Sequence, residues 1–197
     1  MVETDFEAGY IFPVEIKSER LYYTPLHKSE ISEKRLFELN STISSKDTQY
    51  VTFSPYENIL EAKEFIERSE SNFEKGESAT YAIFTQDNDD FIGTAGLEIN
   101  WNRKIAESGV FLYPEYWGHG YGTERGHTFV EVAFKEYTID TWLSRVHTEN
   151  IASQKSIEKY VVGSGGEKCG LIPNYNFDGK LADIYLYSLR RREYNCE

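Results

Sequence analysis

Apolar and polar positions along this chain repeat with two different periods. A period near two, or a short apolar run, is typical of strands and marks the segments 20–26, 79–84, 91–99, 104–113, 141–148, 166–172 and 183–190. A period near 3.6 is typical of amphipathic helices and marks the segments 29–40, 57–75, 120–137 and 150–160. Ser29 or Ser32 is a candidate cap for the first helix, and Gly76 follows the second helix in the position where helices commonly end.

The order of these segments predicts an α+β fold. Three consecutive strand segments, 79–84, 91–99 and 104–113, are separated by short polar turns and predict an antiparallel meander. We therefore expect one domain over residues 1–197, with a central, mixed but mostly antiparallel twisted sheet of about seven strands flanked by about four helices. Residues 41–56 are rich in Ser and Thr and predict an irregular loop, and 174–179 predict a turn.

A glycine-rich stretch, residues 116–126, joins the strand segment 104–113 to the helix segment 120–137. Gly118, Gly120 and Gly122 let the backbone take positive φ angles and approach a ligand closely. A helix that begins there directs unpaired N–H groups and the positive end of its dipole at the same place. Together, a strand, a glycine loop and a helix N-terminus predict an anion site, most often for phosphate.

Two common phosphate loops do not fit this spacing. A Walker loop needs Lys followed by Ser or Thr after its glycines, and a dinucleotide fingerprint needs a third glycine one residue later than Gly122. The spacing resembles instead the Q/R-x-x-G-x-G/A signature of the GNAT acetyltransferases, which cradles the pyrophosphate of coenzyme A. Residues 114–124, P-E-Y-W-G-H-G-Y-G-T-E, resemble more narrowly the loop of the Rim-type branch, which includes the ribosomal-protein N-terminal acetyltransferases.

A second segment, residues 149–159, resembles the E-N-x-x-S-x-x-x-x-E-K pattern of the same branch. From the residues alone, Asn150 is a helix N-cap. The resemblance implies instead that Asn150 anchors the pantetheine arm and that Ser153 lies beside the thioester sulfur. Lys155 is either a phosphate contact or a surface side chain. Many family members carry a Tyr seven residues after this Asn to protonate the leaving thiolate, whereas Ile157 stands at that position here.

The chain also departs from the family just after this segment. The family's E-K-x-G-F is replaced by E-K-Y-V-V-G at residues 158–163, so we expect a rebuilt turn after the last predicted helix. Gly163, or Gly165 with Gly166, is the candidate hinge of that turn.

The resemblance implies an acetyl-CoA-dependent N-acetyltransferase without a metal, in which strands 104–113 and 142–149 splay apart at the cofactor. Glu107 is the candidate general base, because A-E-S-G at residues 106–109 matches the branch's A-E-x-G, and the alternative is an outward-facing strand Glu. Glu98 is the second candidate for the base. Ser153 is the candidate proton donor to the thiolate. The cofactor contacts that the resemblance implies are Phe111, Leu112, Tyr113, Trp117, Gly118, His119, Gly120, Tyr121, Gly122, Thr123, Asn150, Ser153 and Lys155.

Charge and composition restrict the classes of molecule that this protein is expected to bind. The formal net charge of −12 disfavours DNA or RNA binding, and we interpret the basic cluster 190–192 as a solvated tail. No apolar run is long enough for a membrane span, and the N-terminus lacks a signal-peptide pattern, so the expected location is cytoplasmic. Cys169 and Cys196 are expected to be free thiols.

The acceptor stays open at this point. A peptide N-terminus and a small amine are both compatible with the resemblance. We interpret the acidity of the chain first as a source of solubility, and the alternative is that it attracts a cationic acceptor. The alternative to an enzyme is a noncatalytic acyl-CoA-binding or regulatory module. A monomer and a homodimer are equally open.

Overall fold

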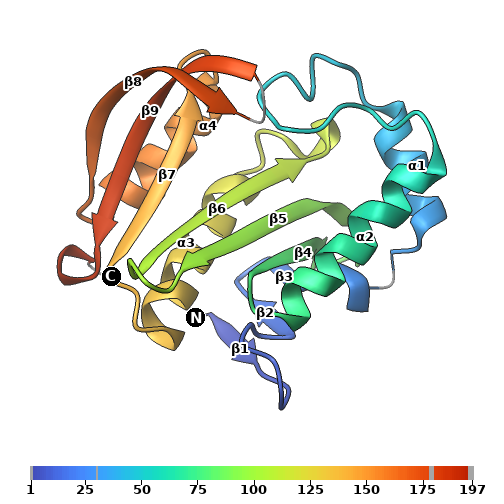
Figure 1. Ribbon diagram of the computed structural model, residues 1–197, viewed down its shortest axis with the longest axis horizontal. Helices are drawn as coiled ribbons and strands as arrows, with labels where there is room; N and C mark the ends of the chain where they lie inside the picture. The colour runs from blue at the N-terminus through green and yellow to red at the C-terminus, as the bar shows by residue number, and fades with distance from the viewer. Residues whose placement is uncertain (1, 30, 178–179, 195–197) are drawn as a thin grey trace. The chain divides into compact units, whose positions relative to one another are not determined.

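The computed structural model describes residues 2–29, 31–177 and 180–194 (Figure 1). These residues contain nine strands and four α-helices, which is more strands than the sequence pattern predicts. The chain gathers into two compact units, Met1–Glu98 with Gly109–His119 and Ile99–Ser108 with Gly120–Glu197. Strands β5 (Phe91–Asn100) and β6 (Ile105–Leu112) contribute to both units. The expectation of a single domain over residues 1–197 stays a prediction.

The first unit holds an antiparallel sheet with the strand order β1-β2-β3-β4-β5. The bounds of its first four strands are β1 Glu3–Asp5, β2 Glu15–Lys17, β3 Leu21–Pro25 and β4 Ser78–Thr85. The hairpin of β4 and β5 confirms the start of the predicted meander. By contrast, β1 and β2 are three-residue strands that the sequence pattern did not indicate.

Helix α2 (Ile59–Glu74) packs against β3 and β4, as Figure 1 also shows. Asn58 caps its first turn, because the side-chain oxygen accepts a hydrogen bond of 3.0 Å from the N–H of Leu60. Phe73 in the last turn is fully buried. Gly76 then takes a φ of +67°, the left-handed conformation that commonly ends a helix. The predicted second helix and its glycine stop are confirmed.

Helix α1 (Glu33–Thr42) begins later than predicted and is capped by Ser32. The hydroxyl oxygen of Ser32 accepts a hydrogen bond of 3.2 Å from the N–H of Arg35. The other candidate cap, Ser29, instead donates its hydroxyl to the carbonyl of Leu26 at 2.6 Å. That bond ends a short 3₁₀ turn, so Ser29 closes the preceding element and does not open the helix.

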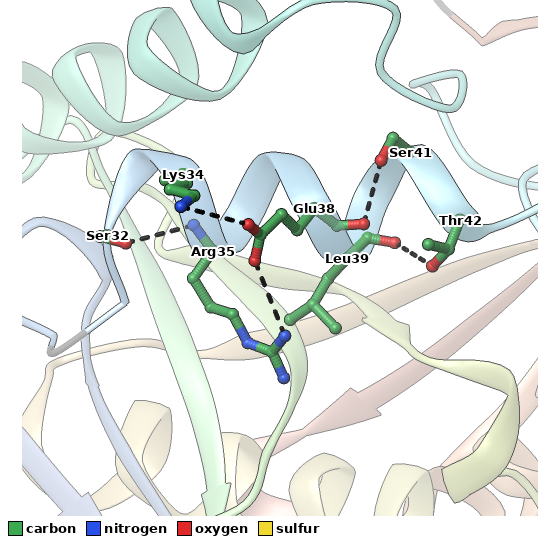
Figure 2. A network of polar contacts seen from close by, with 7 residues as sticks. All are labelled: Ser32, Lys34, Arg35, Glu38, Leu39, Ser41 and Thr42. Atoms are coloured by element: carbon green, nitrogen blue, oxygen red, sulfur yellow. Dashed lines mark hydrogen bonds and ion pairs between the residues drawn. The ribbon is translucent and has the colours of Figure 1, made fainter.

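Polar contacts follow the exposed side of α1 (Figure 2). The carboxylate of Glu38 lies 3.8 Å from the ammonium of Lys34 and 4.0 Å from the guanidinium of Arg35. Ser41 and Thr42 donate their hydroxyls to carbonyls three residues earlier. Exposed pairs of this kind contribute only a few tenths of a kcal/mol each, at about 0.2–0.5 kcal/mol, so packing of Leu36 and its neighbours holds the helix in place.

The second unit holds the strand order β6-β7-β9-β8. The bounds of the last three strands are β7 Thr141–His147, β8 Glu167–Phe177 and β9 Lys180–Arg190. Strand β7 lies parallel to β6, with a register that runs from Ile105↔Thr141 to Glu107↔Leu143. Strand β9 pairs antiparallel with both β7 and β8. The predicted mixed, mostly antiparallel sheet is therefore confirmed.

Strands β8 and β9 are longer than the segments 166–172 and 183–190 that the pattern indicates. The prediction ended β8 before Pro173, but β8 is the last strand in the order and an edge strand tolerates Pro. Asn174 takes a φ of +49° where the register with β9 shifts, so an irregularity replaces the predicted turn there. Of the predicted turn 174–179, residues 178 and 179 lie outside the described residues.

Helices α3 (Tyr121–Glu136) and α4 (Ile151–Ile157) pack together in the second unit. The turn that follows α4 approaches α3 closely at Gly126, because a Cβ built there would lie 2.2 Å from the ring of Tyr160. Tyr160 itself is buried and shares a hydrogen bond of 3.1 Å with Ser144 on β7.

The helix that the sequence predicts over 150–160 changes character halfway. After α4 the chain forms a π-helical turn, Glu158–Val162, which the N–H of Gly163 closes by bonding the carbonyl of Glu158 at 2.9 Å. Gly165 follows with a φ of +101°. The expectation of a rebuilt turn is thus confirmed, and Gly165 is the glycine that supplies its left-handed residue.

Arg191 donates hydrogen bonds to the C-terminal end of α3. Its Nε bonds the carbonyl of Ile139 at 2.6 Å, and its two Nη atoms bond the carbonyls of Phe134 and Tyr137. Carbonyls at a helix C-terminus lack intrahelical donors and carry the negative end of the dipole, so a guanidinium stabilises them. This corrects the interpretation of 190–192 as a solvated tail, because Arg191 ties the segment after β9 to α3.

We expect Arg191→Met to lower the free energy of unfolding by about 2 kcal/mol, because three carbonyls lose a charged donor. Urea unfolding of the two proteins measures this difference. Arg192→Met is the matched control, since the Arg192 side chain is 74% exposed and meets Glu193 at 3.6 Å, and it should cost less than about 0.5 kcal/mol. Equal losses of unfolding free energy in the two variants would contradict a stabilising role for the Arg191 hydrogen bonds.

Candidate functional site

The glycine stretch forms a tight connection from β6 into α3. After β6 ends at Leu112, a 3₁₀ turn over Pro114–Tyr116 leads into Gly118 and Gly120, whose φ angles are +81° and +83°. Gly120 is the N-cap of α3, and its carbonyl accepts the first helical hydrogen bonds at 3.0 Å. Gly120 has no side chain, so no side-chain cap occupies the N-terminus of α3. A helix N-terminus of this kind is a common place for a phosphate, because the helix dipole has its positive end there.

Two side chains fix the shape of this connection within the first unit. Trp117 donates its indole N–H to the carbonyl of Leu112 at 2.7 Å, while its ring stays 49% exposed. Arg20, just before β3, donates to the carbonyl of His119 at 3.0 Å. The structure therefore gives Trp117 a role in shaping the loop, which the sequence did not indicate. The direct contacts of Trp117 and His119 with a cofactor stay predictions.

At the end of β6, the side chains of Phe111 and Tyr113 are not available to a partner, which leaves the backbone groups. The family resemblance implies backbone contacts with the cofactor at this place. Phe111 and Tyr113 are buried, and the Tyr113 hydroxyl donates to the side-chain oxygen of Asn40 at 3.3 Å. Burial raises the pKa of the Tyr113 phenol well above its usual range. The N–H of Tyr113 bonds the carbonyl of Ile92 on β5 at 2.9 Å. Since backbone groups of neighbouring strand residues point to opposite edges, Leu112 directs its own N–H away from β5.

Asn150 is a helix cap, which is the interpretation that the residues alone favour. Its side-chain oxygen accepts a hydrogen bond of 3.1 Å from the backbone N–H of Ser153, at the start of α4. Ser153 is half-buried, and Lys155 is exposed. A contact of 3.1 Å between the hydroxyls of Thr123 and Ser156 joins the first turn of α3 to α4. Thus, in the second unit, the first turn of α3 meets the last turn of α4.

Glu107 belongs to a cluster that the sequence did not indicate. Its carboxylate accepts a hydrogen bond from the Arg145 guanidinium on β7, and the same guanidinium bonds the hydroxyl of Tyr175 on β8. The side chains of Glu107 and Arg145 are 26% and 31% exposed. Alternation along β7 places Arg145 on the same face as Leu143, but its meeting with Glu107 depends on the register between the two strands. The catalytic role of Glu107 stays a prediction.

Other kinds of site receive no support from the described residues. In the described ranges no group of three or more His, Cys, Asp or Glu side chains is arranged to hold a metal ion. No helix in the same part of the chain is long and apolar enough to cross a membrane. Cys169 is an exposed free cysteine, and Cys196 lies outside the described residues.

A strand that passes through a glycine turn into a helix N-terminus without a side-chain cap, in an α+β fold, is an arrangement common at phosphate sites. The family model described as Acetyltransferase (GNAT) domain matches residues 20–160 of this chain. The chain therefore belongs to the GNAT acetyltransferase family, as the glycine spacing predicts.

Relatives agree with this assignment. The chain is 27% identical to the uncharacterized N-acetyltransferase p20 of Bacillus licheniformis over 149 residues, which are 75% of this chain and 82% of that protein. It is 25% identical over 146 residues to the probable N-acetyltransferase YjcK of Bacillus subtilis, covering 73% of this chain and 81% of that one.

Solved structures share the fold at low sequence identity. One is RimL, a ribosomal L7/L12 alpha-N-protein acetyltransferase in complex with coenzyme A, with a TM-score of 0.73, 16% identity and coverage of 88% of this chain and 95% of that chain. Another is spermidine N-acetyltransferase from Vibrio cholerae with coenzyme A and spermine, with a TM-score of 0.69, 18% identity and coverage of 88% and 97%. The predicted GNAT-like α+β fold is confirmed.

Because Gly120 has a left-handed conformation, we predict that substitutions at this position lower the stability of the protein. A β-branched residue is strained at a φ of +83°, so Gly120→Val should lower the free energy of unfolding by about 1–2 kcal/mol. Gly120→Asn should lose less, because Asn tolerates this conformation. Gly96→Ala on β5 is the control, since a Cβ there meets nothing within 4 Å. Chemical unfolding in which Val and Asn cost the same would contradict the argument.

Proposed function

We propose that this protein is an N-acetyltransferase that moves the acetyl group of acetyl-CoA to a primary amine. The observation that carries the proposal is the start of α3 at a left-handed glycine in the second unit, with α4 packed beside the first turn of α3. Helix α3 opens at the left-handed Gly120, and the hydroxyl contact between Thr123 and Ser156 holds α4 beside it. Membership of the GNAT family supports the reaction. Structures of similar fold in complex with acetyl-CoA and with coenzyme A support the donor.

In this proposal the backbone of the glycine loop binds the phosphates of the coenzyme. The N–H groups of residues 118–123 surround the pyrophosphate, and Trp117 keeps the loop in the shape that presents them. His119 and Lys155 are exposed, which suits side-chain contacts with phosphate. The N–H of Leu112 pairs with the pantetheine arm in the manner of an added strand, next to Phe111 and Tyr113.

The residues of α4 act at the other end of the coenzyme. Asn150 already accepts a hydrogen bond from the N–H of Ser153, so its amide NH₂ is the group that meets the pantetheine arm. The hydroxyl of Ser153 lies in the same turn and donates to the sulfur. The cap that the residues favour and the anchor that the family implies are therefore compatible, because they use different atoms of Asn150.

The proposed reaction needs no acyl-enzyme. The acceptor ammonium gives one proton to the carboxylate of Glu107, and the neutral nitrogen attacks the thioester carbon. A C–N bond forms, the C–S bond breaks, and the thiolate takes a proton from Ser153. The second proton of the amine leaves the new amide nitrogen and returns through water to Ser153, and the proton on Glu107 passes to solvent. Most of the rate gain comes from holding amine and thioester close together. Protein or peptide N-termini and small amines, the classes named for RimL and for the spermidine enzyme, are the candidate acceptors.

A noncatalytic acyl-CoA-binding module is the second candidate, because Ile157 stands where many relatives have a proton-donating Tyr. The deciding experiment combines calorimetry of coenzyme A binding with release of free thiol from acetyl-CoA in the presence of an amine panel. We expect both binding and turnover. Gly120→Val should weaken coenzyme A binding at least about tenfold, whereas Gly96→Ala should bind normally. Binding without turnover on any amine would favour the module, and absence of binding would overturn both functions.

The Ser153→Ala variant distinguishes a catalytic role of the Ser153 hydroxyl from the role of Ser153 in the helix cap. The cap uses the backbone N–H of Ser153, which Ala retains, so the free energy of unfolding should change by less than about 0.5 kcal/mol. Turnover should fall about tenfold or more if the hydroxyl protonates the thiolate. Asn150→Ala is the control that loses the cap, at a cost of about 1 kcal/mol. Unchanged turnover in Ser153→Ala would remove this hydroxyl from the mechanism.

A further inference from the structure

Three strands of the second unit contribute to the cluster around Arg145. The guanidinium bonds the carboxylate of Glu107 with Nη2 and the hydroxyl of Tyr175 with Nη1. Its central carbon also lies 5.3 Å from the centre of the Tyr175 ring, in a cation–π contact. Arg145 lies on β7, and Glu107 of β6 and Tyr175 of β8 thus contact its guanidinium from two sides.

The cluster lies on one face of the sheet of the second unit. Ser144, the neighbour of Arg145 on β7, meets Tyr160, and Ser108, the neighbour of Glu107 on β6, meets Arg125 of α3. Because neighbouring strand residues point to opposite faces, Glu107 and Arg145 point away from α3 and α4. Their side chains are 26% and 31% exposed, so solvent reaches the pair although it is partly desolvated.

This ion pair restricts the acceptor that can use Glu107 as a base. A purely cationic amine that draws Glu107 to itself leaves the guanidinium of Arg145 partly buried without its counter-charge, which is costly. An acceptor with its own carboxylate replaces both partners at once. The ammonium takes the place of the guanidinium at Glu107, and the carboxylate takes the place of Glu107 at Arg145, where the planar fork suits two parallel hydrogen bonds.

We propose that the acceptor is a zwitterion, a small amine whose carboxylate lies close to the amine as in an α-amino acid, and that Arg145 is the residue that selects it. The inference rests on the proposed acetyltransferase function and names the substrate class of that same site. When the acceptor carboxylate binds Arg145, the carboxylate of Glu107 is released to take the amine proton. The C–N bond then forms and the C–S bond breaks as in the general reaction. Tyr175 keeps the guanidinium in place during the exchange.

The test compares α-amino acids with their primary amides, which have nearly the same size but no negative charge, and with spermidine. Acetyl-CoA turnover gives kcat/KM for each. We expect the wild-type protein to prefer an acid to its amide at least about tenfold, and Arg145→Met to lose that preference through a lower value for the acid alone. Arg145→Lys keeps a positive charge without the fork and should retain part of the preference.

Lys104→Met is the matched control. Lys104 pairs with Asp140 at 3.6 Å just before the same two strands, β6 and β7, so its removal also deletes a positive charge between them. This variant should keep the wild-type preference. Thermal unfolding and coenzyme A calorimetry of all variants exclude losses that come from folding or cofactor binding.

The outcomes distinguish a failure of the zwitterion inference from a failure of the proposed acetyltransferase function. Turnover of amides and spermidine as readily as of acids would overturn the zwitterion inference and leave the acetyltransferase standing, as would an Arg145→Met protein that keeps its preference. Calorimetry of the binding of the acids and amides to the protein tests the inference independently of acetyl transfer. If the wild-type protein binds no acid more tightly than its amide, the inference is wrong whether or not transfer occurs. Loss of coenzyme A binding would instead count against the proposed function.

Discussion

The reversal of the backbone at Gly118 and Gly120 is the constraint on which the rest of the site depends. Both residues take φ angles near +80°, a conformation that costs other residues about 1–2 kcal/mol. Because of this reversal, the chain leaves β6 and enters α3 within a few residues and presents helix N–H groups directly after the strand. The indole of Trp117 bonds the carbonyl of Leu112 before the turn, and the guanidinium of Arg20 bonds the carbonyl of His119 within it. The loop is therefore held by one local and one sequence-distant side chain as well as by its glycines.

Local patterns in the sequence predicted the elements that local forces determine. The four helices follow from apolar spacing with Ser32, Asn58 and Asn150 as caps, because each cap satisfies an N–H group within three residues of itself. Strands β1 and β2 escaped prediction since three residues are too few to establish an alternation. Contacts such as Arg191 with the end of α3, or Arg145 with Glu107, require strand register and chain reversal, which no local pattern contains. The position and the left-handed glycines of the loop between β6 and α3 could therefore be predicted from the sequence, whereas the meeting of side chains from different strands could not.

The position of Tyr160 bears on how a thiolate could be protonated. Ile157 stands at the place of the family's Tyr and is buried, and the first Tyr after it is Tyr160. The π-helical turn that begins at Glu158 changes which way the following side chains point. Tyr160 packs its ring against Gly126, is 2% exposed, and shares its hydroxyl with Ser144, which also accepts a hydrogen bond from Trp142.

A hydroxyl committed to such a buried network serves the packing of α4 on β7 and is closed to solvent, from which a spent proton donor must be recharged. We therefore do not propose Tyr160 as a substitute for the family's Tyr, although it lies only three residues further along the chain than Ile157. Within α4 the hydroxyl that remains in its exposed first turn is that of Ser153, half-buried and on the residue whose N–H meets Asn150. A serine is a weak acid, so a mechanism that uses it depends on water to restore the proton and on the close positioning of amine and thioester for most of its rate.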